Sequence, residues 1–334
     1  MDRYIQIGEI GRGSSSRVYL MKDAQTHRLV AMKECHLSYY RSLSKSSDDI
    51  FELACREAKL LKGMDHPNVM RCYDYFIEGN YLHMVMEYMG CGDLNHLVDI
   101  FQHSHQLLSE TMILHIFREC VNGLEYIHSH SIVHRDIKPQ NLYLTENGGV
   151  KIGDLGISID FSSPTVPTDC VGTVQYMAPE VVREENADFS ADIWSLGCVL
   201  YELMWRRPLF AEGSYSRLIV QIAEQSNITP STLPEIYTYD LRKLVCSMLQ
   251  VSKDRRPTLP QIQSVLSMLE KPQSDTILSF RRFTDQAFFE NLLRIQPLSS
   301  PVTAPIQYDR IIDGLEKDAE FLIRNNEGLL RIYE

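Results

Sequence analysis

The 334-residue sequence lacks the features that mark a secreted, membrane-spanning or zinc-binding protein. Its eight cysteines are scattered without a C-x-x-C pair, which favours reduced thiols over a disulfide framework or a zinc site. No uninterrupted apolar run approaches the roughly 20 residues that cross a bilayer. The first residues do not form a secretory signal peptide. We therefore expect a cytoplasmic protein without membrane insertion.

The sequence also has fewer basic than acidic side chains, which gives a formal net charge of −11. This balance argues against bulk binding to nucleic acid or to an anionic membrane. The close pairs His103/His105 and His128/His130 have no further ligands at metal-binding spacing, so we expect surface or helix-end histidines. Hydrophobic residues make up 44% and charged residues 23%, as in ordinary globular proteins, and the length allows two lobes.

Two short apolar runs near the middle of the chain form a clear local pattern. Leu142–Leu144 and Val150–Ile152 flank Glu146-Asn147-Gly148-Gly149, whose residues tolerate positive φ, so the runs are predicted to form a β-hairpin. A hairpin brings its outer ends together, and these ends carry Asn141 and Asp154. Hard oxygen ligands of this kind suit Mg²⁺, which is usually held by one or two side chains and substrate phosphates.

Two charged residues just before the hairpin complete a chemical set. Asp136 is free to face a reacting group, and Lys138 supplies a cation near a transferred phosphate. A base that orients a hydroxyl, a nearby cation and two metal ligands are the groups that phosphoryl transfer requires. The set therefore indicates phosphoryl transfer.

The order of these residues resembles the catalytic core of a eukaryotic protein kinase. The motifs that carry this resemblance are His134-Arg135-Asp136, Lys138, Asn141, Asp154-Leu155-Gly156 and Ala178-Pro179-Glu180. Further details are similar to the NIMA-related kinases: Gly153, Ile157-Ser158, Gly92-Asp93-Leu94 and Lys138-Pro139-Gln140-Asn141. The resemblance covers roughly Tyr4 to Leu269.

The resemblance implies an α+β, bilobal protein kinase fold. A small β-rich N-lobe with one main helix is expected over 1–88, and a larger, mostly helical C-lobe over 89–271. Residues 272–334 form a C-terminal extension with helical patterning. Its 3-4-3 apolar spacing is too short for a coiled coil, so packing onto the kinase or docking to a partner is favoured over autonomous dimerisation.

The N-lobe sequence begins as strand, glycine-rich turn and strand. Gly11 and Gly13 allow backbone N–H groups to approach phosphate oxygens, as in the phosphate-covering loop of kinases. Ser16 stands where the family has a third glycine, which should stiffen the loop and alter nucleotide affinity. By resemblance, the remaining nucleotide contacts are Val18, Ala31, Lys33, Met86, Glu87, Met89 and Tyr143. Met86 would be the gatekeeper, with plain strand core as the alternative.

A lysine and a glutamate are predicted to pair across the N-lobe. Lys33 ends an alternating strand, where an exposed lysine is the alternative interpretation. A helix is predicted over Ser46–Met64 with Ser47 as its N-cap, and Glu57 lies on its apolar face. A carboxylate there needs a partner, and the resemblance implies the Lys–Glu pair of active kinases. The polar segment Ser38–Ser47 is interpreted as a flexible loop, with a binding insertion as the alternative.

The activation segment is expected over Asp154–Glu180. Resemblance places its phosphosite at Asp169, so we hypothesise that Asp169 supplies a permanent negative charge to Arg135. A solvated loop carboxylate is the alternative, and Thr168 is a competing phosphosite. Resemblance also implies that Thr173 contacts Asp136 and Lys138, which indicates Ser/Thr over Tyr specificity.

The C-lobe is predicted to be mostly helical. Helical spacing extends over Leu94–Phe101 and Glu110–His130, and an apolar helix begins near Asp192. By resemblance, Asp192 accepts backbone N–H bonds from the catalytic loop. Arg256 is expected to pair with Glu180, also by resemblance.

Two functions of different class follow. The first is a Ser/Thr protein kinase that uses ATP and Mg²⁺ and acts on protein hydroxyls, with a cell-cycle or cytoskeletal role implied by the subfamily. The second is a pseudokinase scaffold, suggested by Ser16, by Leu155 in place of the usual Phe, and by the extension. Every charged group that the chemistry needs is present, so the kinase is favoured.

Overall fold

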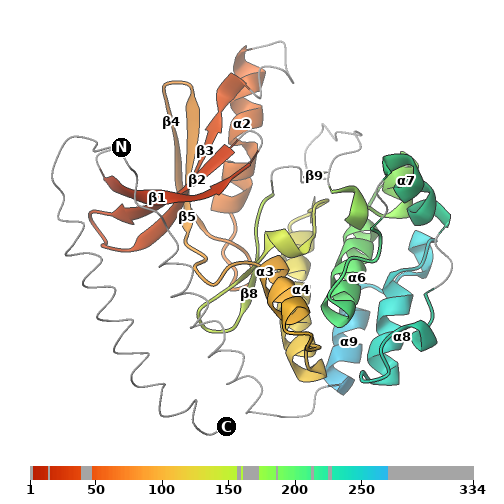
Figure 1. Ribbon diagram of the computed structural model, residues 1–334. Helices are drawn as coiled ribbons and strands as arrows, with labels where there is room; N and C mark the ends of the chain where they lie inside the picture. Colours follow the sequence, from red (N-terminus) through yellow and green to blue (C-terminus); the bar gives the residue numbers. More distant parts are fainter. Residues whose placement is uncertain are drawn as a thin grey trace, which may run out of the picture.

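The structure is a computed structural model that describes residues 3–13, 16–38, 47–155, 159–160, 173–185, 187–211, 214–224 and 228–269. Within these residues the chain forms two lobes, one built on a sheet and one built from helices (Figure 1). The predicted extension over 272–334 lies outside the described residues, so its helices are not tested. No helix in the described ranges combines the length and the apolar character needed to cross a membrane.

The N-lobe sheet has five antiparallel strands in the order β1-β2-β3-β5-β4. Its strands are β1 (Tyr4–Arg12), β2 (Ser16–Asp23), β3 (Leu29–His36), β4 (Cys72–Glu78) and β5 (Tyr81–Glu87). The turn between β4 and β5 places Gly79 at φ +58, the left-handed region that glycine adopts without strain.

Helix α2 (Ser47–Lys62) packs against β4 and β5. Its buried face carries Ala54, Ala58 and Leu61, which follow helical spacing and are at most 1% exposed. The helix begins at Ser47 and ends at Lys62, within two residues of the predicted bounds Ser46 and Met64. Most of the predicted loop before the helix, residues 39–46, lies outside the description.

The C-lobe is built around two buried helices. Its helices are α3 (Leu94–His103), α4 (Glu110–Ser129), α5 (Pro179–Val182), α6 (Phe189–Trp205), α7 (Tyr215–Glu224), α8 (Tyr239–Met248) and α9 (Leu259–Leu269). Apolar residues on one face of α4 are 0% exposed: Ile113, Ile116, Phe117, Cys120, Leu124 and Ile127. Helix α6 is apolar on nearly all sides and packs against α4 and α8, as expected for a helix in the interior of a large lobe.

Short elements at the top of the C-lobe carry the candidate chemistry. These are β6 (Ile132–Val133), η1 (Pro139–Asn141), β7 (Leu142–Leu144), β8 (Val150–Ile152), β9 (Ile159–Asp160) and η2 (Val174–Tyr176). Strands β7 and β8 pair antiparallel, so the predicted hairpin is confirmed. Two further 3-10 turns are η3 (Pro230–Thr232) and η4 (Lys253–Arg255).

Candidate active site

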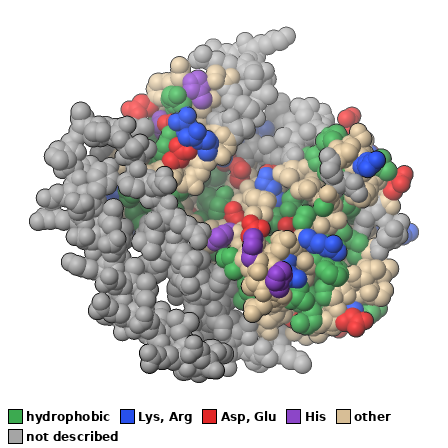
Figure 2. Space-filling view, viewed as in Figure 1, with side chains coloured by type: hydrophobic (Ala, Val, Ile, Leu, Met, Phe, Trp, Pro, Cys, Tyr) green, Lys and Arg blue, Asp and Glu red, His purple; other side chains and the backbone are tan. Residues whose placement is uncertain are grey.

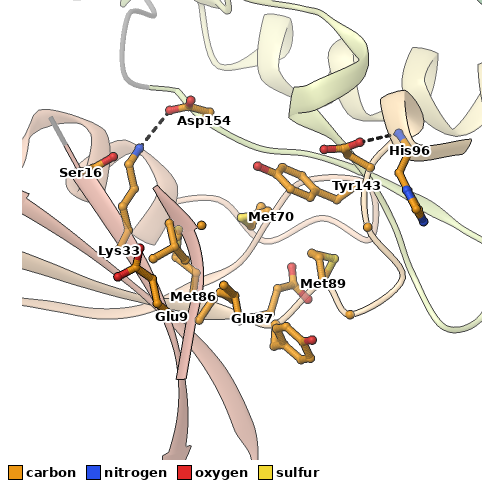
Figure 3. A pocket seen from close by; sticks show the side chains of 18 of the residues that line it. Glu9, Ser16, Lys33, Met70, Met86, Glu87, Met89, His96, Tyr143 and Asp154 are labelled. Atoms are coloured by element: carbon orange, nitrogen blue, oxygen red, sulfur yellow. Dashed lines mark hydrogen bonds and ion pairs between the residues drawn. The ribbon is translucent and has the colours of Figure 1, made fainter. Parts of the chain in front are cut away.

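A cavity of about 580 Å³ lies between the two lobes. It is lined by β1 to β3, by the segment that follows β5, and by β7 and Asp154 (Figure 3). Acidic and basic side chains come together where the lobes meet (Figure 2). The predicted nucleotide contacts in its wall are Gly11, Ser16, Val18, Ala31, Lys33, Met86, Glu87, Met89 and Tyr143.

Gly13 is the predicted nucleotide contact that does not line the cavity. Its N–H donates to the Ser16 carbonyl at 2.8 Å, so it closes the turn between β1 and β2. A Cβ at Gly13 would lie 3.1 Å from the Ser16 hydroxyl, so the turn has little spare room. Gly13 therefore shapes the edge of the cavity from outside its wall.

Sequence reasoning missed part of the wall. The missed residues are Glu9, Ile10, Met70, Gly90, Gly92, Asp93 and His96. Asp93 is the N-cap of α3, and its side chain accepts the His96 N–H at 2.9 Å. Burial raises the pKa of Asp93. An N-cap signal is visible in Gly92-Asp93-Leu94, so this residue was open to prediction.

Lys33, Glu57 and Asp154 form one ion cluster at the back of the cavity. The Lys33 Nζ donates to both Glu57 oxygens, at 2.8 and 3.1 Å, and to Asp154 Oδ1 at 3.1 Å. The predicted Lys33–Glu57 pair is therefore present, and Lys33 is not an exposed strand-end lysine. Burial opposes the charged ammonium, but the two carboxylates outweigh it and raise the pKa of Lys33 well above its usual range.

Asp154 has an unusual backbone, with φ +62. A left-handed conformation is uncommon for a non-glycine residue and is found at functional sites that the surroundings enforce. Here Leu155 is 1% exposed in the core, and the Gly153 N–H donates to the Asn141 carbonyl at 2.9 Å. Burial opposes ionisation of Asp154, but Lys33 outweighs it and lowers the pKa of that carboxyl.

Asp136 lies at the centre of a second group of contacts. Its Oδ2 accepts from Lys138 Nζ at 2.6 Å and from Asn141 Nδ2 at 3.0 Å. Its Oδ1 accepts from the Thr173 N–H at 3.1 Å and the Thr173 hydroxyl at 3.0 Å. Lys138 also donates to the Thr173 Oγ1 at 2.8 Å, so the contacts predicted for Thr173 are present.

Asp192 holds the backbone of the loop that carries Asp136. Its fully buried carboxylate accepts the N–H groups of His134 at 2.8 Å and Arg135 at 2.9 Å, as predicted. It also contacts His128 Nε2 at 2.8 Å. Burial opposes ionisation of Asp192, but its contact with His128 and the loop lowers its pKa. His128 ends a helix as expected, but it is largely buried against this carboxylate and is not a surface residue.

The donor set fits Mg²⁺ bound together with nucleotide phosphates. No group of three or more His, Cys, Asp or Glu side chains suited to a metal occurs within the described residues. Mg²⁺ does not need such a group, because one or two oxygen ligands and substrate phosphates suffice. Asn141 donates through Nδ2 to Asp136, which leaves Oδ1 as its ligand atom, and the backbone contact with Gly153 brings Asp154 close.

Arg256 and Glu180 form a fork-to-fork ion pair beneath the site. Arg256 Nη1 and Nη2 lie 2.6 and 2.7 Å from the two Glu180 oxygens. Both side chains are buried, and the pairing itself is the one that the resemblance to kinases implied. Asp169 and Thr168, the candidates for activation, lie outside the described residues, and so do Gly156, Ile157 and Ser158.

Comparison with known proteins points in one direction. The protein kinase domain model matches residues 4–267. The chain is 35% identical over 283 residues to "Probable serine/threonine-protein kinase nek3" of Dictyostelium discoideum, covering 81% of this chain and 24% of that protein. It is 38% identical over 259 residues to mouse "Serine/threonine-protein kinase Nek3", covering 77% of this chain and 48% of that one.

A further relative shows the same pattern over a longer stretch. Mouse "Serine/threonine-protein kinase Nek1" is 32% identical over 310 residues, covering 91% of this chain and 24% of the relative. The chain thus spans between about a quarter and a half of the length of these relatives.

Proposed function

The chain belongs to the protein kinase family, and its named relatives are NIMA-related Ser/Thr kinases; from this premise we propose that it transfers the γ-phosphate of ATP to serine and threonine hydroxyls of proteins. The observation that carries the proposal is the network around Asp136, in which one carboxylate contacts Lys138, Asn141 and Thr173. A base, a cation and a metal ligand therefore lie together, and Asn141 accepts the N–H of Gly153, the residue before Asp154 in the cavity wall.

Each residue then has a role in transfer. Asp136 orients the substrate hydroxyl and accepts its proton while the oxygen attacks the γ-phosphorus and the bond to the β-phosphate oxygen breaks. Lys138 neutralises charge on the phosphoryl group in transit, and Lys33, positioned by Glu57, binds the α- and β-phosphates. When bound, Mg²⁺ would neutralise part of the negative charge of the ATP phosphates. Asn141 and Asp154 are the residues that would hold it.

The decisive experiment removes the base without removing the nucleotide site. In Asp136→Asn the amide cannot accept the hydroxyl proton, so phosphate incorporation into a generic Ser/Thr substrate should fall by about 10²–10⁴-fold. ATP affinity should stay nearly unchanged, because Asp136 does not line the cavity. Unreduced phosphate transfer by this variant would refute the assignment.

Nothing in the described structure favours the scaffold alternative. Leu155 fills a buried apolar position at 1% exposure, and Ser16 lines the cavity without blocking it. A pseudokinase would bind ATP and show no transfer in the wild-type chain, and that result would favour it.

Asp169 is proposed as a built-in activating charge. The support is its position four residues before Thr173, where NIMA-related kinases tend to carry a phosphosite. Activity that survives phosphatase treatment and falls in Asp169→Ala would support the idea. Activity lost on treatment and regained with Mg·ATP would favour Thr168 or another phosphosite.

We also propose a cytoplasmic location, with association to the cytoskeleton implied by the subfamily alone. None of the seven cysteines within the described residues forms a disulfide, which supports a reducing compartment. Residues 272–334 are proposed to dock on the kinase or on a partner. Microscopy of a tagged full chain, and of one truncated after Leu269, tests both proposals.

A further inference from the structure

A second cavity, of about 500 Å³, adjoins the junction between the lobes. We call it the rear cavity. It is lined by residues 64–67 after α2, by Arg28, Arg71, Tyr73 and Lys151, and by Glu87 at the end of β5. Among the described residues, Glu87 lines both the rear cavity and the nucleotide cavity. The rear cavity has no part in the phosphate transfer proposed above.

The rear cavity carries more cation than its own carboxylates neutralise. Lys151 Nζ lies 3.0 Å from Glu87 Oε1, and both side chains are largely buried, so this pair is firm. Arg71 Nη1 lies 3.4 Å from Asp65 Oδ1, but Asp65 is 81% exposed, and such exposed pairs contribute little. No described carboxylate lies within 4.0 Å of the Arg28 guanidinium.

Arg28 and Arg71 both influence the electrostatics at Tyr73 in the rear cavity. Burial raises the pKa of the Tyr73 hydroxyl and the Glu87 charge adds to the rise, while the Arg28 and Arg71 guanidinium groups oppose it. The two arginines come from different segments, the turn before β3 and the residue before β4, yet both line the rear cavity with Tyr73. His66 adds a further donor position, because its Nδ1 accepts the Asn68 N–H at 3.1 Å and Nε2 is the nitrogen left for a ligand.

This chemistry suits a phosphate group on a peptide. Arginine forks bind phosphate oxygens in pairs, and a phosphoserine or phosphothreonine carries nearly two negative charges. The cavity is close in size to the nucleotide cavity, so it exceeds what one inorganic ion would fill. The chain as a whole carries a net charge of −11, so an excess of cations here is local and opposite in sign to the rest.

We propose that the rear cavity is a docking site for a phosphorylated Ser or Thr peptide of a partner protein. Arg28 and Arg71 hold the phosphate, and the Tyr73 ring and the 64–67 segment contact the neighbouring peptide residues. Lys151 adds to the positive potential in the rear cavity while it stays paired with Glu87.

The test is direct binding of a peptide to the full chain. The protein carries Asp136→Asn and the assay omits nucleotide, so a failed kinase assignment would not affect the result. The probe is a fluorescent peptide with one phosphoserine among acidic residues, read by polarisation, beside its unphosphorylated twin. The double variant Arg28→Ala/Arg71→Ala should weaken binding by about tenfold or more, since each lost charged hydrogen bond costs about 1.5–3 kcal/mol, which is tenfold or more in Kd.

A matched control removes two other N-lobe charges. Arg12→Ala/Lys62→Ala deletes two exposed cations that pair with Glu9 and Asp74, outside the rear cavity. This variant should bind the phosphopeptide within about twofold of the unaltered chain. Asp65→Asn should change affinity in the opposite sense and tighten binding by about two- to threefold, because it removes a competing negative charge at little structural cost.

Several outcomes would overturn the proposal. Equal losses in the two double variants would show that only net charge matters, and equal binding of the unphosphorylated peptide would remove the role of phosphate. Complete displacement by a few millimolar inorganic phosphate would mean a bare anion site. Binding that is lost in Lys138→Met and kept in Arg28→Ala/Arg71→Ala would place the peptide at the active site.

Discussion

Glu180 and Glu57 are two buried carboxylates of this chain that each pair with a cation. The two pairs differ in how many other groups the cation contacts. In the C-lobe, Glu180 meets Arg256 through two bonds of 2.6 and 2.7 Å. Arg256 also donates to three backbone carbonyls and packs over the Trp194 ring at 5.1 Å. In the cleft, Glu57 meets Lys33, whose single ammonium is shared with Asp154.

The two pairs differ in charge balance and in whether the hydrogen-bond donors of the cation are all used. Every donor of Arg256 is used, and one positive charge meets one negative charge, so the pair is closed to other ligands. In the cleft, two carboxylates surround one ammonium, and Asp154 is 41% exposed. That excess of negative charge leaves room for a further cation, which is what a Mg·ATP site needs. A buried ion pair thus stabilises the lobe in one place and prepares a ligand site in the other.

A third buried glutamate has no cationic partner among the residues that the structure describes. Glu202 on α6 accepts the Tyr176 hydroxyl at 2.8 Å, and both side chains are buried. Burial raises the pKa of Glu202 to about 7, with the Tyr176 bond opposing the rise and the Asp99 charge adding to it. The three glutamates therefore form a series from full pairing, through shared pairing, to a partly neutral acid.

The largest expected effect comes from breaking the saturated pair. Arg256→Met leaves Glu180 buried without its partner, so the free energy of unfolding should fall by about 3–5 kcal/mol. Denaturant titration measures this loss. Lys253→Met is the matched control, because Lys253 pairs with Asp188 at 2.7 Å in a partly exposed setting and its loss should cost under about 1 kcal/mol.

A second variant keeps this prediction sharp. Arg256→Met/Glu180→Leu removes both charges, so it should be more stable than Arg256→Met alone. A double variant that is less stable than the single one would show that packing, not the uncompensated charge, explains the loss.

Breaking the shared pair should act on turnover instead. Lys33→Met removes the cation that would meet the nucleotide phosphates, so kcat/KM should fall by about 10²–10³-fold. Stability should also fall, because Glu57 is left buried without its partner, but by less than in Arg256→Met, because Asp154 is partly exposed and can be hydrated. The control Lys62→Met removes an exposed pair with Asp74 and should leave both quantities nearly unchanged. A stability loss as large as that of Arg256→Met would erase the distinction between the two pairs.

The neutral member of the series predicts a pH dependence. Between about pH 4.5 and 7 the folded chain keeps a proton on Glu202 that the unfolded chain releases, so stability falls as pH rises through this window. The full shift corresponds to about 3 kcal/mol. Glu202→Gln still accepts the Tyr176 hydroxyl but cannot titrate, so it should lack this part of the slope. Urea unfolding of both proteins from pH 5 to 8 gives the difference, in which the other acids cancel. Parallel profiles would contradict the assignment.

Sequence reasoning succeeded where motifs place charged groups at fixed spacing. The Lys33–Glu57 pair and the Arg256–Glu180 pair were expected, and each is present. The hairpin that brings Asn141 towards Asp154 followed from turn chemistry and strand pairing alone. Three helices of the C-lobe, α3, α4 and α6, followed from apolar periodicity, with ends that differ by up to three residues.

What sequence missed depended on tertiary placement. His128 was expected to be an ordinary helix-end residue, yet the path of α6 brings Asp192 within 2.8 Å of its ring. Glu202 gave no signal, because an acid within an apolar helix can equally face solvent. The rear cavity joins residues from 28 to 151, and no local pattern connects such distant positions. Asp169 remains a prediction that the described residues do not reach.

The smallest expected effect concerns the contact that links the substrate side of the cleft to Asp136. Thr173 donates to Asp136 Oδ1 and accepts from Lys138, so it sets the distance between the base and the cation. Thr173→Val keeps the shape and the backbone bond but loses both hydroxyl contacts, and kcat should fall by about tenfold, near 1.4 kcal/mol. Thr173→Ser should restore most of the rate. ATP affinity should not change, because Thr173 does not line the nucleotide cavity. If the valine variant lost ATP affinity and kept its kcat, the Thr173 hydroxyl would not be positioning Asp136 relative to Lys138. The two hydroxyl contacts would then contribute to packing and not to catalysis.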